Sequence, residues 1–222
     1  MRLRYLLLFL ALVLFSVSTS YGQNEQAPFY KDIISFSQKD STNPPPKGAI
    51  LFTGSSSFTK WTNMQEMFPG HTIINRGFGG SSLPDVIRYA ENVIYPYAPK
   101  QVVIYCGDND IAGGADSKIV TERFKTLFQM IRKKLPAASI VFVSIKPSPS
   151  REKFMPVAKQ VNQLIKNYLW QQGNAGFVDV FTPMLNAEGK ARPELFLDDM
   201  LHMKPEGYVI WQKAMEPYLV KN

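Results

Sequence analysis

Five short apolar runs, four of them followed by a stretch with helical periodicity, limit the fold of this sequence more than any other feature. Runs of this length that are rich in β-branched and aromatic residues are typical of buried strands. Strands that alternate with amphipathic helices form right-handed βαβ units, in which helices cover both sides of a parallel sheet. The predicted strands are Ala49–Thr53, Thr72–Asn75, Gln101–Tyr105, Ser139–Ile145 and Gly176–Val180.

The segments between these runs carry apolar residues at intervals of three and four. This spacing predicts helices within residues 86–94, 119–135, 157–168 and 205–219. A chain of 222 residues, 45% of them hydrophobic, is long enough for one domain with a sizeable core. We therefore expect an α/β protein with a flavodoxin-like three-layer α/β/α sandwich around a five-stranded parallel sheet.

The N-terminus has the pattern of a secretory signal peptide. Arg2 and Arg4 precede an apolar run that is short for a membrane span, and small residues follow around Ser20 and Gly22. We predict a signal peptide over residues 1–22 and an exported protein, either periplasmic or secreted. An uncleaved membrane anchor is the alternative, which the short apolar run disfavours, so we expect no stable membrane insertion.

Residues 23–48 are predicted to form an N-terminal arm, and residues 49–222 the main domain. The arm is polar, but Phe29, Ile33 and Phe36 are spaced as on one face of a helix before the break at Asn43–Pro46. That face should pack on the domain.

Charge and residue counts exclude several classes of function. The net charge of +7 is spread along the chain, with no basic run longer than the three residues Arg132–Lys134, so nucleic-acid binding has little support. Cys106 is the single cysteine and cannot form an internal disulfide. With only two histidines there is no His/Cys cluster of metal-binding spacing, and we expect neither a metal nor a cofactor.

Polar residues gather where the predicted strands end. Ligands of an open α/β sheet bind at the carboxyl ends of its strands. One edge of the sheet therefore gathers a serine, glycine-rich backbone, an asparagine and an Asp/His pair, which are the parts of a serine hydrolase. The segments concerned are residues 54–57, 76–82, 106–110, 146–151 and 198–202.

Other interpretations of these segments are weaker. The three serines could cap a helix, and so could Asn109. Residues 77–82 could be a tight turn, but Ser82 replaces the third glycine of a dinucleotide fingerprint, and residues 54–61 lack the glycine and Ser/Thr that would complete a phosphate loop. Cys106, at the end of a buried strand, fits a small core residue. His71 has no acid near it in sequence and is predicted to lie on the surface, which leaves His202 as the general base.

Four of these blocks together resemble the SGNH, or GDSL-type, hydrolase family. Gly54–Ser56 resembles its Gly-Asp-Ser block, Asn75–Gly80 its second block, Gly107–Asp110 its Gly-x-Asn-Asp block and Asp199–His202 its Asp-x-x-His block. The departure is Ser55, where the family usually has Asp. Phe52, the three serines and Trp61 also resemble the branch related to platelet-activating-factor acetylhydrolase subunits.

The resemblance implies a triad and an oxyanion hole. Its nucleophile would be Ser56, with His202 as base and Asp199 orienting the imidazole. The oxyanion donors would be the backbone N–H groups of Ser56 and Gly80 and the side-chain amide of Asn109.

We therefore expect an exported serine esterase that hydrolyses short-chain esters, most simply acetyl esters, on a carbohydrate. Loops at the expected site carry basic residues that could contact the alcohol part: Arg76, Lys146, Arg151 and Lys153. A lipid or lysophospholipid esterase and a catalytically silent binding protein are the alternatives. The acyl group, the alcohol and the oligomeric state do not follow from the sequence.

Overall fold

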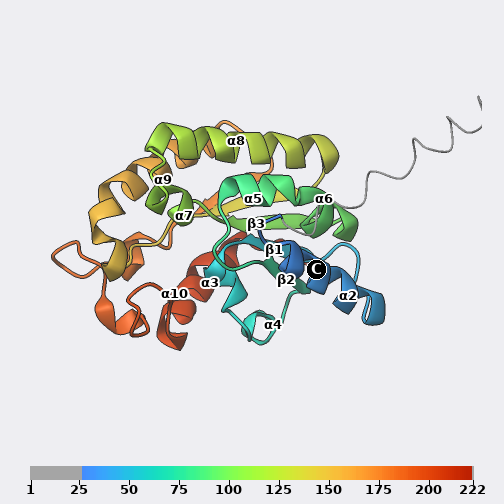
Figure 1. Ribbon diagram of the computed structural model, residues 1–222, viewed down its shortest axis with the longest axis horizontal. Helices are drawn as coiled ribbons and strands as arrows, with labels where there is room; N and C mark the ends of the chain where they lie inside the picture. The colour runs from blue at the N-terminus through green and yellow to red at the C-terminus, as the bar shows by residue number, and fades with distance from the viewer. Residues whose placement is uncertain (1–26, 222) are drawn as a thin grey trace, which may run out of the picture.

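The computed structural model of the protein describes residues 27–221, so the predicted signal peptide and residues 23–26 of the predicted arm lie outside the described residues. A five-stranded parallel sheet forms the centre of the molecule, with the strands in the order β2-β1-β3-β4-β5 (Figure 1). This is the flavodoxin-like order. The strands are β1 (Ile50–Gly54), β2 (Ile73–Gly77), β3 (Gln101–Tyr105), β4 (Ser139–Val143) and β5 (Ala175–Val178).

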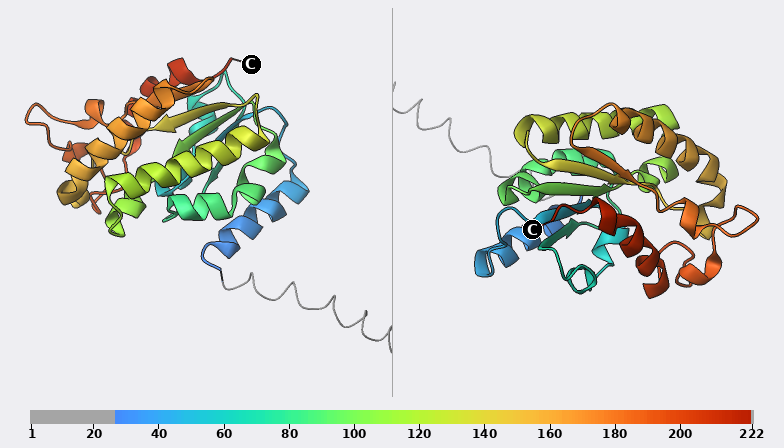
Figure 2. Two further views of the ribbon diagram at one scale, coloured as in Figure 1. Left: turned by 90° about the horizontal axis from the view of Figure 1, so that it is seen from above. Right: turned by 180° about the vertical axis from the view of Figure 1, so that it is seen from behind.

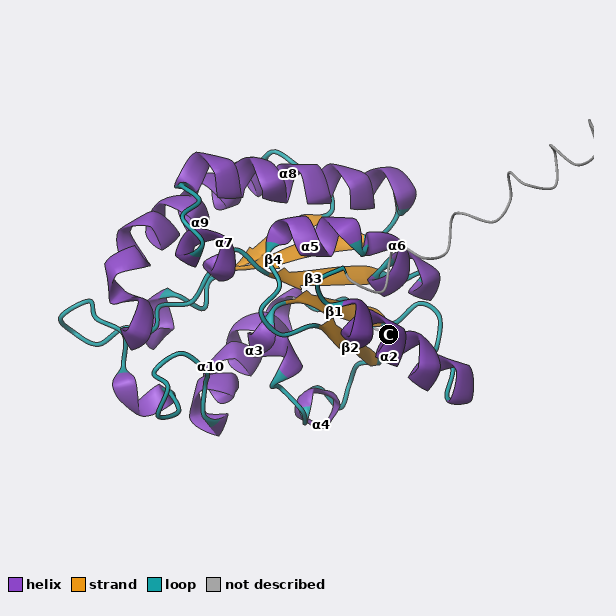
Figure 3. Ribbon diagram, in the orientation of Figure 1, coloured by secondary structure: helices purple, strands orange, loops and turns teal. Residues whose placement is uncertain are grey.

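Helices cover both faces of the sheet, as predicted (Figure 3). The longer ones were expected from their periodicity, whereas α3, α4 and α7 are too short to show one. Their bounds are α2 (Tyr30–Thr42), α3 (Ser56–Thr59), α4 (Met64–Met67), α5 (Leu83–Arg88), α6 (Ala90–Val93), α7 (Asp108–Ala112), α8 (Ser117–Lys134), α9 (Met155–Trp170) and α10 (Pro205–Met215). Short 3-10 helices lie at Tyr95–Tyr97, Pro149–Phe154, Thr182–Met184, Pro193–Leu195 and Glu216–Tyr218.

Two separate cores explain why the strands read as continuous apolar runs. Successive side chains of a strand point to opposite faces, so Leu51 packs with α5, α6, α8 and α9 while Ile50 and Phe52 pack with α3, α4 and α10. Figure 2 shows the two layers of helices from above and from behind. Both faces are buried, so neither can be polar.

Strands β4 and β5 end earlier than predicted, because the side chain of Ser144 takes the place of backbone carbonyls as hydrogen-bond acceptor beyond their ends. The hydroxyl of Ser144 accepts the backbone N–H groups of Val180 and Phe181 at 2.9 and 3.0 Å. These contacts draw the chain out of the sheet after Val178, although Val180 is still fully buried. Apolar residues therefore continue past the ends of β4 and β5, and periodicity alone could not place those ends.

Two predicted helices are shorter than their periodicity indicated. The first is broken at Tyr89, whose φ of −100° and ψ of 11° separate α5 from α6. The last ends at Met215, and a 3-10 turn continues over Glu216–Tyr218. Pro217 lacks the N–H that a further helical turn would need. Tyr218 and Leu219 therefore lie beyond the helix on which their spacing placed them.

The part of the predicted arm that is described forms α2. Ile33 is buried in the core beside α5 and α6, and the ring of Phe29 contacts that of Phe78 with their centroids 5.4 Å apart. The predicted apolar face thus packs on the domain, and Asp40 ties the helix to β2 through Arg76. Within residues 27–221, no helix is long and apolar enough to cross a membrane.

Candidate active site

Ser56 lies at the first turn of α3, immediately after β1. The strand ends at Gly54, which has a φ of 134° and whose missing Cβ would lie 1.8 Å from the carbonyl oxygen of Tyr105. Only glycine can make this turn. Ser55 then donates its backbone N–H to the same carbonyl at 3.0 Å, so the chain turns sharply and Ser56 becomes the first residue of the helix.

Close packing holds the short helix α3 in place. A Cβ at Gly77 would lie 2.8 Å from Cβ of Phe58, so the end of β2 approaches α3 more closely than any other residue would allow. Asn75 donates its side-chain amide to the carbonyl of Phe58 at 2.7 Å. From the other side, the hydroxyl of Tyr208 on α10 donates to the carbonyl of Ser57 at 3.0 Å.

His202 and Asp199 lie against Ser56. Nε2 of His202 is 3.0 Å from the hydroxyl oxygen of Ser56, and Nδ1 is 2.5 Å from Oδ2 of Asp199. The three predicted triad side chains thus form one hydrogen-bonded chain. With the imidazole proton on Nδ1, Nε2 is free to accept the serine proton.

The turn 199–202 fixes the Asp199 carboxylate toward the imidazole. Oδ1 accepts the backbone N–H groups of Leu201 and His202, each at 2.9 Å. The N–H of His202 and then its side chain hold the pKa of Asp199 well below its usual range. Met200, between them, takes a left-handed φ of 53° that closes the turn.

Hydrogen bonds join the segment after β3 to the segment after β2, near Gly80. Asn109 donates its side-chain amide to the carbonyl of Ser81 at 3.0 Å, and Asp110 accepts the N–H of Leu83 at 2.9 Å. Asp110 is also paired with Arg123 at 2.8 Å, although burial raises its pKa. Asn109 is the second residue of α7, and Gly107 occupies the capping position, so Asn109 is not a helix cap.

Two backbone N–H groups at this edge have no acceptor among the residues described. Neither Ser56 nor Gly80 donates its N–H to a carbonyl or side chain within residues 27–221. The amide of Asn109 donates one hydrogen to Ser81, and its second has no acceptor among residues 27–221. These are the three donors expected for an oxyanion hole.

The sequence of the chain matches the GDSL-like lipase/acylhydrolase family over residues 41–210, which is more than half of its length. The protein belongs to that family. It is therefore a carboxylic ester hydrolase, and its α/β/α architecture is that of the family. None of the curated proteins matches the chain.

Solved structures with this architecture resemble the GDSL-like acylhydrolase along most of its length. A candidate platelet activating factor from Streptococcus pneumonia has a TM-score of 0.75 and 23% identity, covering 86% of this chain and 92% of the other. A GDSL-like lipase from Bacteroides thetaiotaomicron has a TM-score of 0.69 and 21% identity over 84% and 96%. A variant of an acetyl xylan esterase from Geobacillus stearothermophilus has a TM-score of 0.59 and 16% identity over 80% and 99%.

In this GDSL-like acylhydrolase, a buried carboxylate lies beside Ser55, the residue that departs from the family pattern. Oδ1 of Asp108 is 3.5 Å from the hydroxyl of Ser55, and Oδ2 is 3.4 Å from that of Tyr105. Lys146 and Arg151 approach the same carboxylate at 3.7 and 3.5 Å. An acid is thus present next to Ser55, but it comes from the loop after β3.

Three of the four basic residues expected to meet the substrate are engaged elsewhere. Arg76 donates to Asp40 and Tyr97. The side chain of Lys146 is 1% exposed, and burial lowers its pKa. Arg151 is held by the loop after β3. The expectation that these side chains contact the alcohol was wrong for Lys146, which is buried, and of the four only Lys153 is exposed.

The prediction for His71 was wrong, whereas that for Cys106 is confirmed. His71 is buried, not on the surface, because its Nε2 meets Glu216 at 3.2 Å, a partner 145 residues away that the sequence could not indicate. Cys106 is fully buried in the core, where desolvation raises the pKa of its thiol well above the usual value. It is a small core residue, as its position at a strand end indicated.

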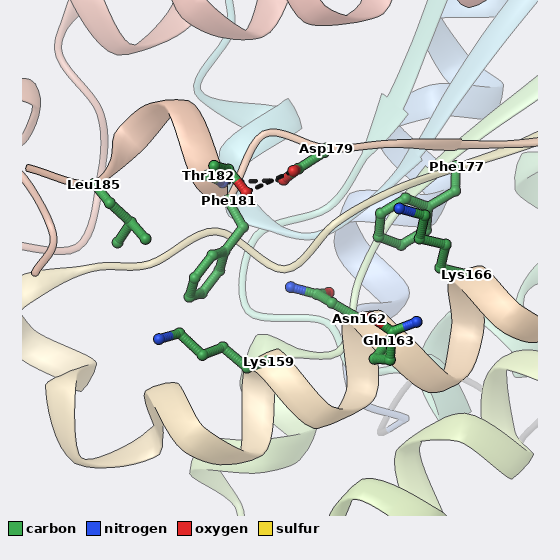
Figure 4. A pocket seen from close by; sticks show the side chains of 9 residues that line it. All are labelled: Lys159, Asn162, Gln163, Lys166, Phe177, Asp179, Phe181, Thr182 and Leu185. Atoms are coloured by element: carbon green, nitrogen blue, oxygen red, sulfur yellow. Dashed lines mark hydrogen bonds between the residues drawn. The ribbon is translucent and has the colours of Figure 1, made fainter. Parts of the chain in front are cut away.

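Within residues 27–221, no three His, Cys, Asp or Glu side chains are placed to hold a metal ion. A pocket of about 360 Å³ lies between α9 and the segment after β5 (Figure 4). Its polar side chains include Lys159, Lys166 and Asp179, and Asp179 is bonded to Thr182. None of the predicted site residues lines it, so it is separate from the Ser56 site.

Proposed function

We propose that this protein is an exported serine esterase that removes a short acyl group, acetyl above all, from a polar alcohol such as a sugar hydroxyl. The observation that carries the proposal is the hydrogen-bonded chain from Asp199 through His202 to Ser56. Membership of the GDSL-like family supports ester hydrolysis. The contacts of the individual residues support the roles that we assign to them below.

In the first half of the reaction, Ser56 attacks the ester carbonyl. A neutral serine hydroxyl is a weak nucleophile, so Nε2 of His202 takes its proton as the bond to carbon forms. Asp199 keeps the imidazole proton on Nδ1 and stabilises the imidazolium. The imidazolium then returns its proton to the leaving alcohol, and the acyl group remains on Ser56.

The negative charge of the tetrahedral intermediate needs donors that are already in place. The unbonded N–H groups of Ser56 and Gly80 and the second amide hydrogen of Asn109 are suited to this task. Loss of one such donor typically lowers kcat by about 10²–10³. In the second half, water attacks the acyl-serine and gives a proton to His202, which returns it to the Ser56 oxygen as the bond to the acyl carbon breaks and the carboxylic acid leaves.

Exposed backbone next to Ser56 supports a short acyl group. Gly79 is exposed, and a Cβ added there would lie 3.9 Å from Cβ of Ser56. One structure of the same fold is that of an acetyl xylan esterase. A specific observation favours a lipid ester instead: Leu197 and Met200, on the segment that carries Asp199 and His202, are 41% and 39% exposed and could meet an acyl chain.

Activity on p-nitrophenyl acetate, butyrate and octanoate decides between these acyl groups. We expect kcat/KM to be highest for acetate; rates that rise with chain length would favour the lipid ester. Release of acetate from acetylated xylan would then support a carbohydrate substrate.

Adjacent serines provide the matched control for the nucleophile. Ser56→Ala should abolish turnover and labelling by a fluorophosphonate. Ser57→Ala should keep both, because the Ser57 side chain is buried and it is the Ser56 hydroxyl that contacts His202. Labelling that persists in Ser56→Ala would contradict the assignment.

Export is supported by the N-terminal sequence pattern alone. Mass spectrometry of the protein from the cell envelope or the medium should find a chain that lacks residues 1–22 or nearly so. An intact N-terminus on the accumulated protein would contradict cleavage.

A further inference from the structure

The segment after β4 contacts both the turn that carries Asp199 and His202 and the start of α7, where Asn109 lies. Arg151 lies in the 3-10 helix Pro149–Phe154 and is partly buried. Its Nη1 donates to the backbone carbonyl of Asp108 at 2.6 Å, and its Nη2 donates to Oδ1 of Asn109 at 2.9 Å. The planar fork of one guanidinium therefore binds the first two residues of α7, Asp108 and Asn109.

The contact with Oδ1 determines which way the Asn109 amide faces. The two ends of an amide have nearly the same shape, but a guanidinium can only donate, so Arg151 pairs with the oxygen of the amide and not with its nitrogen. Nδ2 is then directed to the carbonyl of Ser81, which it reaches at 3.0 Å. With both ends bound, the direction of the second Nδ2 hydrogen is fixed as well.

Ser150, the residue before Arg151, binds the turn that carries Asp199 and His202. Ser150 donates its backbone N–H and its hydroxyl to the carbonyl of Met200, at 3.1 and 2.9 Å. Met200 lies between Asp199 and His202. The pair Ser150–Arg151 thus spans from the turn of the acid and base to the amide of Asn109.

We propose that Arg151 is a positioning residue for ester hydrolysis, which orients the Asn109 amide toward the oxyanion through its contact with Oδ1. The inference rests on the proposed function, in which Asn109 is an oxyanion donor. Arg151 acts on the reaction through Asn109, and Ser150 anchors the segment that carries it to the turn 199–202.

A role in charge balance is the competing explanation, because Arg151 also lies 3.5 Å from the carboxylate of Asp108. Arg151→Lys separates the two. It keeps the positive charge but cannot grip two acceptors in the fork geometry. If Arg151 orients Asn109, the lysine variant fails nearly as badly as Arg151→Met, whereas a charge role predicts that lysine restores most of the rate.

A double-mutant cycle with Asn109→Ala tests whether Arg151 acts through the amide. The rate of fluorophosphonate labelling and kcat for p-nitrophenyl acetate should fall about 10- to 100-fold in Arg151→Met, with KM little changed. In the Asn109→Ala background the same substitution should change either rate by no more than about twofold. Multiplicative losses in the cycle would overturn the proposal.

Arg132 supplies the matched control. It also binds backbone carbonyls through a fork, those of Ala138 and Asn174 among them, but at the opposite edge of the sheet. Arg132→Met should lower the melting temperature and leave the labelling rate unchanged. If Arg151→Met does no more than this, its role is structural only and the proposal fails.

An NMR measurement that does not depend on turnover distinguishes this inference from the proposed function. The side-chain amide signals of Asn109 in a ¹⁵N NMR spectrum, identified by their loss in Asn109→Ala, should shift in Arg151→Lys and in Arg151→Met. Unchanged signals would overturn the positioning role even in an active enzyme. Shifted signals in a protein without esterase activity would sustain it and count against the proposed function.

Discussion

The hydroxyl of Ser56 lies 3.0 Å from Nε2 of His202, a residue 146 positions further along the chain. Ser56 follows β1, whereas His202 lies just before α10, and Tyr208 on that helix binds the carbonyl of Ser57. The contact is thus maintained by the packing of α10 on α3. Each of the two residues can also be tested against another residue of its own type, Ser57 for Ser56 and His71 for His202.

The two histidines should respond in opposite ways to substitution. His202→Ala should lower kcat by at least about 10³, because Ser56 loses its base. His71→Ala should keep kcat within about twofold but reduce the free energy of unfolding by about 1–3 kcal/mol, because a buried side chain bonded to Glu216 is removed. Ester assays and urea unfolding measure the two effects. Equal losses of activity would place His71 in the site.

The pH dependence of activity should show no ionisation of Asp199. Its pKa is depressed, chiefly by the backbone N–H of His202, so the carboxylate stays charged as pH falls to about 4. Its stabilising contribution is present above the unfolded pKa and is lost only as pH falls through the lower folded pKa. Plots of kcat/KM from about pH 4 to pH 8 should therefore contain no ionisation of this carboxyl group. A carboxyl ionisation of Asp199 in that range would contradict this.

Asn109→Ala should affect the rate far more than stability. Loss of an oxyanion donor costs about 10²–10³ in kcat. Asp116 is the comparison, because it caps α8 by accepting the N–H of Ile119 at 2.8 Å. Asp116→Ala should lower stability by about 1 kcal/mol and leave kcat unchanged. A variant of Asn109 that behaves like that of Asp116 would argue against the oxyanion role.

Gly79 tests where the acyl group lies. A Cβ at this position would be 3.9 Å from Cβ of Ser56 and 4.0 Å from the hydroxyl oxygen of Thr59, which are ordinary contacts, so Gly79→Ala should fold. Its stability should rise by about 0.4–1 kcal/mol, because alanine restricts the unfolded chain. The new methyl group should lower kcat/KM for butyrate more than for acetate. An unchanged ratio would place the acyl group elsewhere.

Much of the fold could be predicted because its determinants are local. Ile50–Thr53 is apolar or β-branched along its whole length, and such a run indicates a strand buried on both faces wherever it occurs. The candidate site could be located for the same reason, since a parallel sheet brings the residues after its strands to one edge. Ser56, Gly80 and Asn109 lie at that edge with Asp199 and His202, and their catalytic roles remain predictions.

The sequence by itself therefore determined the order of the strands and longer helices along the chain. It also determined the short sequence blocks that supply the residues of the site. The tertiary structure alone decided the partners of the charged and polar side chains: Asp40 for Arg76, Asp108 for Lys146, Glu216 for His71 and Asn109 for Arg151. Periodicity is a property of neighbouring residues, so it can be read along the chain. An ion pair or hydrogen bond between residues tens of positions apart depends on how the layers pack, and that packing decided which basic side chains remain free to meet a substrate.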